Sequence, residues 1–94
     1  MEHRLEYLEN ALKNTDEQLR ELLLARLELS YDLAVERASR GISVWDVTRD
    51  SAVLAGMTAE LPQPQAQVMY QVWSIMLREE RQQYFLGRNR VVRP

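Results

Sequence analysis

A row of leucines along the first third of the chain is the feature that most constrains its fold. The row consists of Leu5, Leu8, Leu12, Leu19, Leu22, Leu29 and Leu33. Spacings of three, four or seven residues place these side chains on one side of an α-helix, with a single break at Thr15. A helix of about 36 residues is on the order of 50 Å long. Two shorter helices cannot cover a stripe of that length, so we expect a second chain to cover it.

The few glycines and prolines mark where the helices end. Gly41 ends the first stretch, Pro62 and Pro64 bracket a connection, and Gly87 ends the last stretch. The expected helices are 4–39, 47–60 and 64–86, and no segment alternates as a strand would. The predicted fold class is therefore all-α, with one long, one short and one medium helix in an intertwined homodimeric bundle. We expect one helical domain, 1–87, and a basic C-terminal tail, 88–94. A partner of different sequence would cover the stripe equally well.

Composition and charge exclude several classes of protein. The chain has no cysteine, which excludes a disulfide scaffold, a thiolate metal site and a cysteine nucleophile. With His3 as its one histidine, a multi-histidine metal site is excluded, and no metal is expected. No apolar run reaches the roughly 18–20 residues that span a bilayer, and no signal peptide precedes the charged start. We therefore expect a cytoplasmic protein without a membrane partner, and the net charge of −2 argues against a nucleic-acid partner.

Two arginines interrupt the leucine stripe. Arg26 follows Leu22 by four residues, and Arg37 follows Arg26 by eleven, so both face the leucine side about 16 Å apart along the axis. A buried charge must meet an anion. That anion is either an internal carboxylate or a bound ligand. The internal candidates are Asp46, Asp50 and Glu79.

Polar residues also follow the apolar side of the last helix and open the second one. Continuing the spacing of Val72 and Ile75 leads to Glu79 and then to Gln82 or Gln83, which predicts either a buried hydrogen-bond network or the wall of a polar pocket. Asp46 is a good N-cap residue for the second helix. The charges from Asp46 to Asp50 also fit an exposed helix start without any function. The chain has no nucleophile beside a base and no phosphate loop, so an enzyme of this sequence would work by positioning and fixed charge.

Taken together, the order and spacing of these residues resemble the all-helical (AroQ-type) chorismate mutases. The shared frame is Asp16-Glu17-x-Leu19, Leu22-Leu23-x-x-Arg26, Arg37, Asp46-x-x-Arg49-Asp50, Ile75-Met76 and Gln83. The resemblance implies an intertwined homodimer that converts chorismate, a dicarboxylate, to prephenate by a concerted [3,3] rearrangement. It also implies that no cofactor is needed. Catalysis would consist of holding a compact substrate and stabilising negative charge on its ether oxygen.

The resemblance also assigns roles to individual residues. Arg37, where the family typically has a lysine, and Gln83 would be the catalytic groups at the ether oxygen. Arg26 would bind a substrate carboxylate. Asp46 and Arg49 match the Asp-x-x-Arg frame, with Arg49 near the ring end. Asp50 stands at the glutamate that binds the ring hydroxyl.

Two expected substrate-binding positions depart from the family. An early arginine that reaches across the dimer falls on Glu9, and a small hydroxyl residue falls on Glu79. These changes make the pocket about three charge units more negative than the family pattern, which disfavours a dianion. Three functions therefore stay open. The first is a chorismate mutase, and the second is an enzyme for a relative (a 4-amino-4-deoxychorismate mutase or an isochorismate-pyruvate lyase). The third is a non-catalytic helical dimer that binds a regulator or a partner enzyme.

Overall fold

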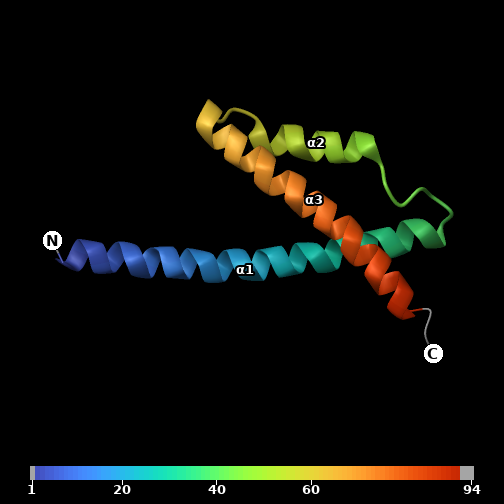
Figure 1. Cartoon of the computed structure of the whole chain (residues 1–94), viewed down its shortest axis with the longest axis horizontal. Helices are drawn as coiled ribbons and strands as arrows, with labels where there is room; N and C mark the ends of the chain where they lie inside the picture. The colour runs from blue at the N-terminus through green and yellow to red at the C-terminus, as the bar shows by residue number, and fades with distance from the viewer. Residues whose placement is uncertain (1, 92–94) are drawn as a thin grey trace.

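The computed structural model describes residues 2–91, and the side chains within 3–86, as three helices (Figure 1). Helix α1 is Glu2–Ser39, α2 is Val47–Thr58 and α3 is Gln63–Val91. No strand occurs in these residues, so the all-α class is confirmed. The first two helices match their expected extents closely, but α3 continues through Gly87 to Val91. The expected stop at Gly87 is therefore wrong, and residues 92–94 of the expected tail lie outside the described part of the chain.

Helix α1 ends in a motif built around Gly41. The Gly41 amide donates to the carbonyl of Ala38, and the Ile42 amide donates to the carbonyl of Arg37 over 2.9 Å. This pair of bonds is the Schellman arrangement, which satisfies carbonyls that the helix end leaves free. Gly41 has φ +70, a backbone conformation that other residues adopt only with strain. The glycine therefore stops α1 and turns the chain back toward α2.

The three helices form a flat, open arrangement. Helices α2 and α3 fold back on each other as a hairpin, and α3 then crosses the C-terminal half of α1 (Figure 1). The molecule extends over 58 × 34 × 15 Å. Aromatic rings fill the crossing: Tyr84 lies 6.0 Å from Tyr31 and 5.7 Å from Trp45, measured between ring centroids. Among the described side chains the buried apolar residues are Ala34 and Tyr84, so the core of a single chain is small.

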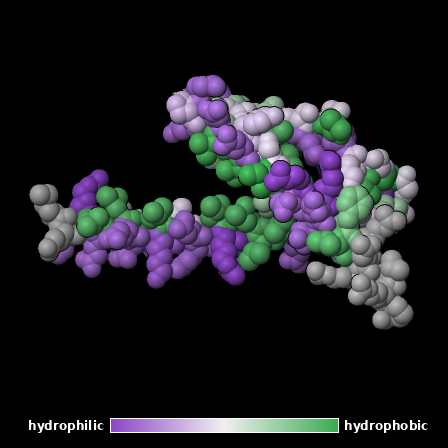
Figure 2. Space-filling model, in the orientation of Figure 1, coloured by the Kyte–Doolittle hydropathy of each residue, from purple (hydrophilic) through white to green (hydrophobic). Residues whose placement is uncertain are grey.

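The leucine stripe lies uncovered on this open arrangement. Leu12 is 64% and Leu22 is 68% exposed. Figure 2 shows apolar side chains along the edge of α1 that faces the α2–α3 hairpin, and polar ones along the opposite edge. The chain exposes 7913 Å², whereas a compact monomer of 11.1 kDa exposes on the order of 5,700 Å². A single chain thus leaves much of its apolar surface unburied.

Within the described residues, no helix combines the length and the apolar character that crossing a bilayer requires.

Replacing Gly41 and Gly56 by alanine should change the free energy of unfolding in opposite directions. An added Cβ meets nothing within 4 Å at either position, so only the backbone decides. Gly41→Ala should lower the free energy of unfolding by about 1 kcal/mol, because alanine is strained at positive φ. Gly56→Ala, inside α2, should raise it by about 0.5–1 kcal/mol through helix propensity. Urea unfolding at one protein concentration measures both, and a shift of the same sign would contradict this account of the α1 end.

Candidate functional site

A cavity of about 180 Å³ lies where the three helices and the connection before α2 meet. Its lining residues are Arg26, Leu29, Ser30 and Leu33 from α1, Trp45 from the connection, Arg49, Asp50 and Val53 from α2, and Leu77 and Glu80 from α3. An apolar cavity of roughly 150 Å³ is large enough for a benzene ring. This cavity therefore has room for a ring-sized molecule, between aliphatic walls that also carry four charged groups.

The centre of the cavity wall is an ion pair between α1 and α3. Arg26 Nε lies 3.2 Å from Glu80 Oε2, and the Glu80 side chain is only 4% exposed. The angle between the groups does not suit a hydrogen bond, so both atoms are buried without a hydrogen-bond partner. The Arg26 guanidinium also stacks 4.7 Å above the Trp73 ring. Burial raises the pKa of the Glu80 carboxyl above its ordinary 4.5, although the charge of Arg26 works in the opposite direction.

This ion pair corrects the expected partner of Arg26 and the expected inward face of α3. The internal anion is Glu80, and none of Asp46, Asp50 and Glu79 pairs with Arg26. The Glu79 side chain is 54% exposed, 3.8 Å from Arg78, and Gln83 is exposed as well.

The physical reason is that α3 carries two apolar stripes. Val68, Val72 and Ile75 form one stripe, which is exposed in the single chain. Trp73, Leu77 and Tyr84 form the other, which packs inward and brings Glu80 with it. The 4–3–4 spacing of Trp73, Leu77, Glu80 and Tyr84 in the sequence indicates that these four residues share one side of α3. The aliphatic stripe of the same helix led to the other side being expected to face inward. In the single chain Glu79 and Gln83 do not line the cavity, and their expected place in a site shared by two chains stays a prediction.

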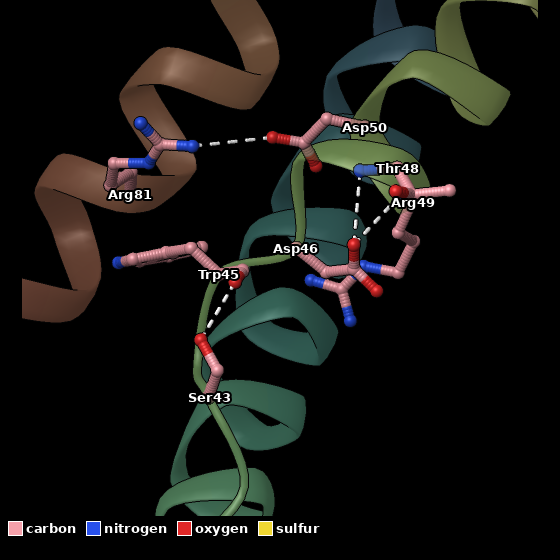
Figure 3. A network of polar contacts seen from close by, with 7 residues as sticks. All are labelled: Ser43, Trp45, Asp46, Thr48, Arg49, Asp50 and Arg81. Carbon is pink, nitrogen blue, oxygen red and sulfur yellow. Dashed lines mark hydrogen bonds and ion pairs between the residues drawn. The ribbon is translucent and has the colours of Figure 1, made fainter.

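The start of α2 delivers two charged residues to the cavity. Asp46 caps the helix: its Oδ1 accepts hydrogen bonds from the amides of Thr48 (2.9 Å) and Arg49 (3.4 Å) (Figure 3). Asp46 thus has a structural role and does not line the cavity, whereas Arg49 and Asp50 do. Asp50 Oδ2 lies 3.3 Å from Arg81 Nη2 of α3, which fixes α2 against α3 (Figure 3).

The other expected site residues lie elsewhere in the chain. Arg37 is half-buried, and its Nε donates to the Ser43 carbonyl over 2.7 Å, so it ties the connection to the end of α1. Glu9 is exposed and precedes Arg26 by 17 residues, which is about 25 Å of helix. Of the expected residues, the cavity brings together Arg26, Arg49 and Asp50. Sequence reasoning missed Glu80 and Trp45.

The charges of the lining side chains balance. Two guanidinium groups, on Arg26 and Arg49, face two carboxylates, on Asp50 and Glu80. Three buried side-chain atoms of lining residues have no hydrogen-bond partner within the described chain: Arg26 Nε, Trp45 Nε1 and Glu80 Oε2. Arg26 Nε and Glu80 Oε2 compensate each other's charge as an ion pair at 3.2 Å, which leaves Trp45 Nε1 as the one of the three without such a partner in the described chain. Across the described residues no histidine or carboxylate cluster of three could hold a metal ion.

The fold and cavity define this chain as an all-helical protein with a small pocket of mixed apolar and charged lining between its helices. No protein-family model, no curated protein and no solved structure matches the chain. The resemblance to the all-helical chorismate mutases therefore rests on the residues and their spacing alone.

Replacing Glu80 should change how stability depends on pH. The pKa of Glu80 is raised in the folded chain, so folding favours its protonated form, and the contribution of Glu80 to stability falls as pH rises from 4.5 through the raised pKa. Glu80→Gln removes this titration and leaves Arg26, Arg49 and Asp50 in place. The free energy of unfolding of the variant, relative to wild type, should therefore increase with pH above 4.5 and then level off.

Urea unfolding of both chains between about pH 4 and pH 8 measures this difference. Glu79→Gln is the matched control, because it changes the neighbouring carboxylate, which is 54% exposed. The account of the inward face of α3 would be contradicted if the difference in unfolding free energy from wild type depended on pH for Glu79→Gln and did not depend on pH for Glu80→Gln.

Proposed function

We propose that this chain is a chorismate-mutase-like isomerase that works as a homodimer. The observation that carries the proposal is the convergence of Arg26 from α1 with Arg49 and Asp50 from α2 on one ring-sized cavity. The resemblance assigns these three residues to a substrate carboxylate, the ring end and the ring hydroxyl. Their meeting in one cavity, from helices distant in sequence, is what a shared substrate site requires.

The proposed chemistry is a concerted rearrangement of chorismate, or of a close relative, without a covalent intermediate. Arg26 and Arg49 hold the carboxylates, while the aliphatic walls keep the substrate folded so that its reacting ends meet. Fixed positive charge then stabilises the transition state more than the ground state. Arg37 and Gln83 lie outside the cavity of a single chain, so the proposal depends chiefly on Arg26 and Arg49. Arg26 contacts Glu80 through Nε, so a substrate carboxylate would bind the Nη groups of its guanidinium.

The dimer is proposed because one chain leaves the leucine stripe uncovered. Subtracting the surface of a compact monomer from that of this chain leaves an excess of about 2,200 Å², and stable interfaces bury about 1,200–2,000 Å² or more in total. A second copy presents the same stripe, so a two-fold contact is self-complementary. The apolar edge of α1 faces the open angle between this helix and the α2–α3 hairpin (Figures 1 and 2).

A second candidate function is a non-catalytic helical dimer that binds a regulator or a partner enzyme. The Arg26–Glu80 ion pair favours it, because Glu80 already supplies the carboxylate that Arg26 would otherwise take from a substrate. Removing one partner of a buried pair leaves an uncompensated charge. A ligand that displaced Arg26 from Glu80 would therefore have to compensate Glu80 as well.

An activity assay separates the two functions. Purified protein is incubated with chorismate, isochorismate and 4-amino-4-deoxychorismate, and the products are resolved by liquid chromatography. We expect rearrangement or pyruvate loss with at least one of them. Arg26→Ala should lower kcat/KM at least about 30-fold, because losing a buried charge pair to a ligand costs roughly 2–5 kcal/mol. Arg20→Ala, a change on the exposed side of α1 at a side chain 72% exposed, should leave it unchanged. Absence of product from all three compounds would favour the second candidate.

Sedimentation tests the dimer. Leu12→Glu puts a negative charge on the leucine stripe, and Asn10→Glu puts the same charge on the opposite side of α1. Both residues are exposed in the single chain. Loss of a buried leucine from each copy costs roughly 1.5–3 kcal/mol per side chain, so Leu12→Glu should raise the dimer dissociation constant at least about 100-fold. Asn10→Glu should change it little. Equal effects of the two variants, or a monomeric wild type, would exclude the stripe as a dimer interface.

A further inference from the structure

The Arg26 guanidinium is held on two sides and still has donors for a ligand. Its Nε lies 3.2 Å from Glu80 Oε2, and its central carbon lies 4.7 Å from the centre of the Trp73 ring. A guanidinium has five N–H donors, so the contact at Nε leaves the four donors of the two Nη groups. The Arg26 side chain lines the cavity and is 32% exposed, which leaves it accessible to a ligand. A carboxylate bound at the Nη groups shares this one cation with Glu80.

The charges around the cavity leave one net positive charge. Three guanidinium groups surround two carboxylates: Arg26 and Arg49 line the cavity with Asp50 and Glu80, and Arg81 pairs with Asp50 from outside the lining. A dicarboxylate brings two negative charges to this site, which is one more than it compensates. Because like charges close together cost several kcal/mol, a dianion binds better if one protein carboxylate loses its charge.

Glu80, rather than Asp50, is the carboxylate that can lose its charge. The Asp50 side chain is 22% exposed and lies 3.3 Å from Arg81 Nη2, so both water and a cation stabilise its ionised form. The Glu80 side chain is 4% exposed. Burial raises the pKa of its carboxyl above the ordinary 4.5.

The groups that face Glu80 come from α1 and α2. The Asp50 carboxylate raises the pKa of Glu80 further, whereas Arg26, the Ser30 hydroxyl and Arg49 lower it. A ligand carboxylate at Arg26 adds a second negative neighbour and occupies the cation that most favours the ionised form. Both effects raise the pKa of Glu80 again when the ligand binds.

We propose that Glu80 adapts the site to a dianion: when a ligand carboxylate binds the Nη groups of Arg26, Glu80 takes up one proton from solvent. The proton adds to a carboxylate oxygen of Glu80, and no other bond forms or breaks. The two net positive charges that remain then match the two carboxylates of the ligand. This inference deepens the proposed function, and it rests on that proposal for the dicarboxylate class of the substrate.

Calorimetric titration with a ring-sized dicarboxylate measures the proton. The probe, trans-cyclohexane-1,4-dicarboxylate, is titrated into the wild-type chain between about pH 6 and about pH 8 in two buffers of different ionisation enthalpy. The difference in binding enthalpy between the buffers counts the protons taken up. We expect uptake that approaches one proton per site, with an affinity that falls by up to about tenfold per pH unit where uptake is complete. The absence of uptake throughout this range, or of saturable binding below about 10 mM, would overturn the inference.

Variants assign the proton to Glu80. Glu80→Gln keeps the size of the side chain and removes its charge, so it should abolish uptake and bind the probe at least about tenfold more tightly than wild type near pH 8. A merely structural role of Glu80 predicts weaker binding instead. Glu28→Gln changes an exposed carboxylate on α1 outside the cavity and should leave uptake unchanged. Uptake that persists in Glu80→Gln, or weaker binding by this variant near pH 8, would overturn the inference.

A second variant serves if Glu80→Gln does not fold. The Asp50 carboxylate raises the pKa of Glu80, so Asp50→Asn should move the range of proton uptake to lower pH without abolishing it. Loss of uptake in Asp50→Asn would assign the proton to Asp50, and an unchanged pH range would show that Glu80 does not titrate. Either result would overturn the inference.

These outcomes are distinguishable from failure of the proposed function. Turnover of chorismate, together with probe binding that takes up no proton, would overturn this inference and leave the isomerase proposal standing. Proton uptake that depends on Glu80, without turnover of any chorismate relative, would support this inference and count against the isomerase.

Discussion

The arrangement of this chain depends on the place where α3 crosses α1. Tyr84 fills the crossing between Tyr31 and Trp45, and the Arg26–Glu80 ion pair lies one turn of α3 away. A buried ion pair adds little net stability, because desolvation of the two charges offsets most of their attraction. It does penalise other registers, since sliding or rotating α3 would bury Glu80 away from Arg26. The aromatic contacts therefore stabilise the crossing, and the charges select one register for it.

The same register determines the chemistry of the cavity. Rotating α3 by one residue would replace the buried Glu80 with another side chain and change the charge balance of the site. The resemblance to chorismate mutases predicts a net positive pocket for a dianion. The cavity of the single chain is lined by Arg26 and Arg49 with Asp50 and Glu80, and Arg81 pairs with Asp50 from outside this lining.

The parts of the structure that follow from local rules were predictable from the sequence. Gly41 ended α1 and Asp46 capped α2 because a positive φ and an N-cap carboxylate act within a few residues. The position of Arg26 on the inner side of α1 followed from the leucine spacing. The inward face of α3 did not follow, because this helix has two apolar stripes and only the packing partner decides which one turns inward. In the single chain the buried carboxylate is therefore Glu80, and neither Glu79 nor Gln83 lines the cavity.

The thinness of the molecule has a consequence for how it unfolds. Along its shortest axis the chain extends over 15 Å, which is the depth of one helix crossing another. Among the described side chains the buried apolar ones are Ala34 and Tyr84. A single chain therefore gains little stability from burial of apolar surface. If a second copy supplies the missing interior, assembly and acquisition of structure become a single equilibrium. The melting temperature then rises with protein concentration, and dilution alone denatures the chain.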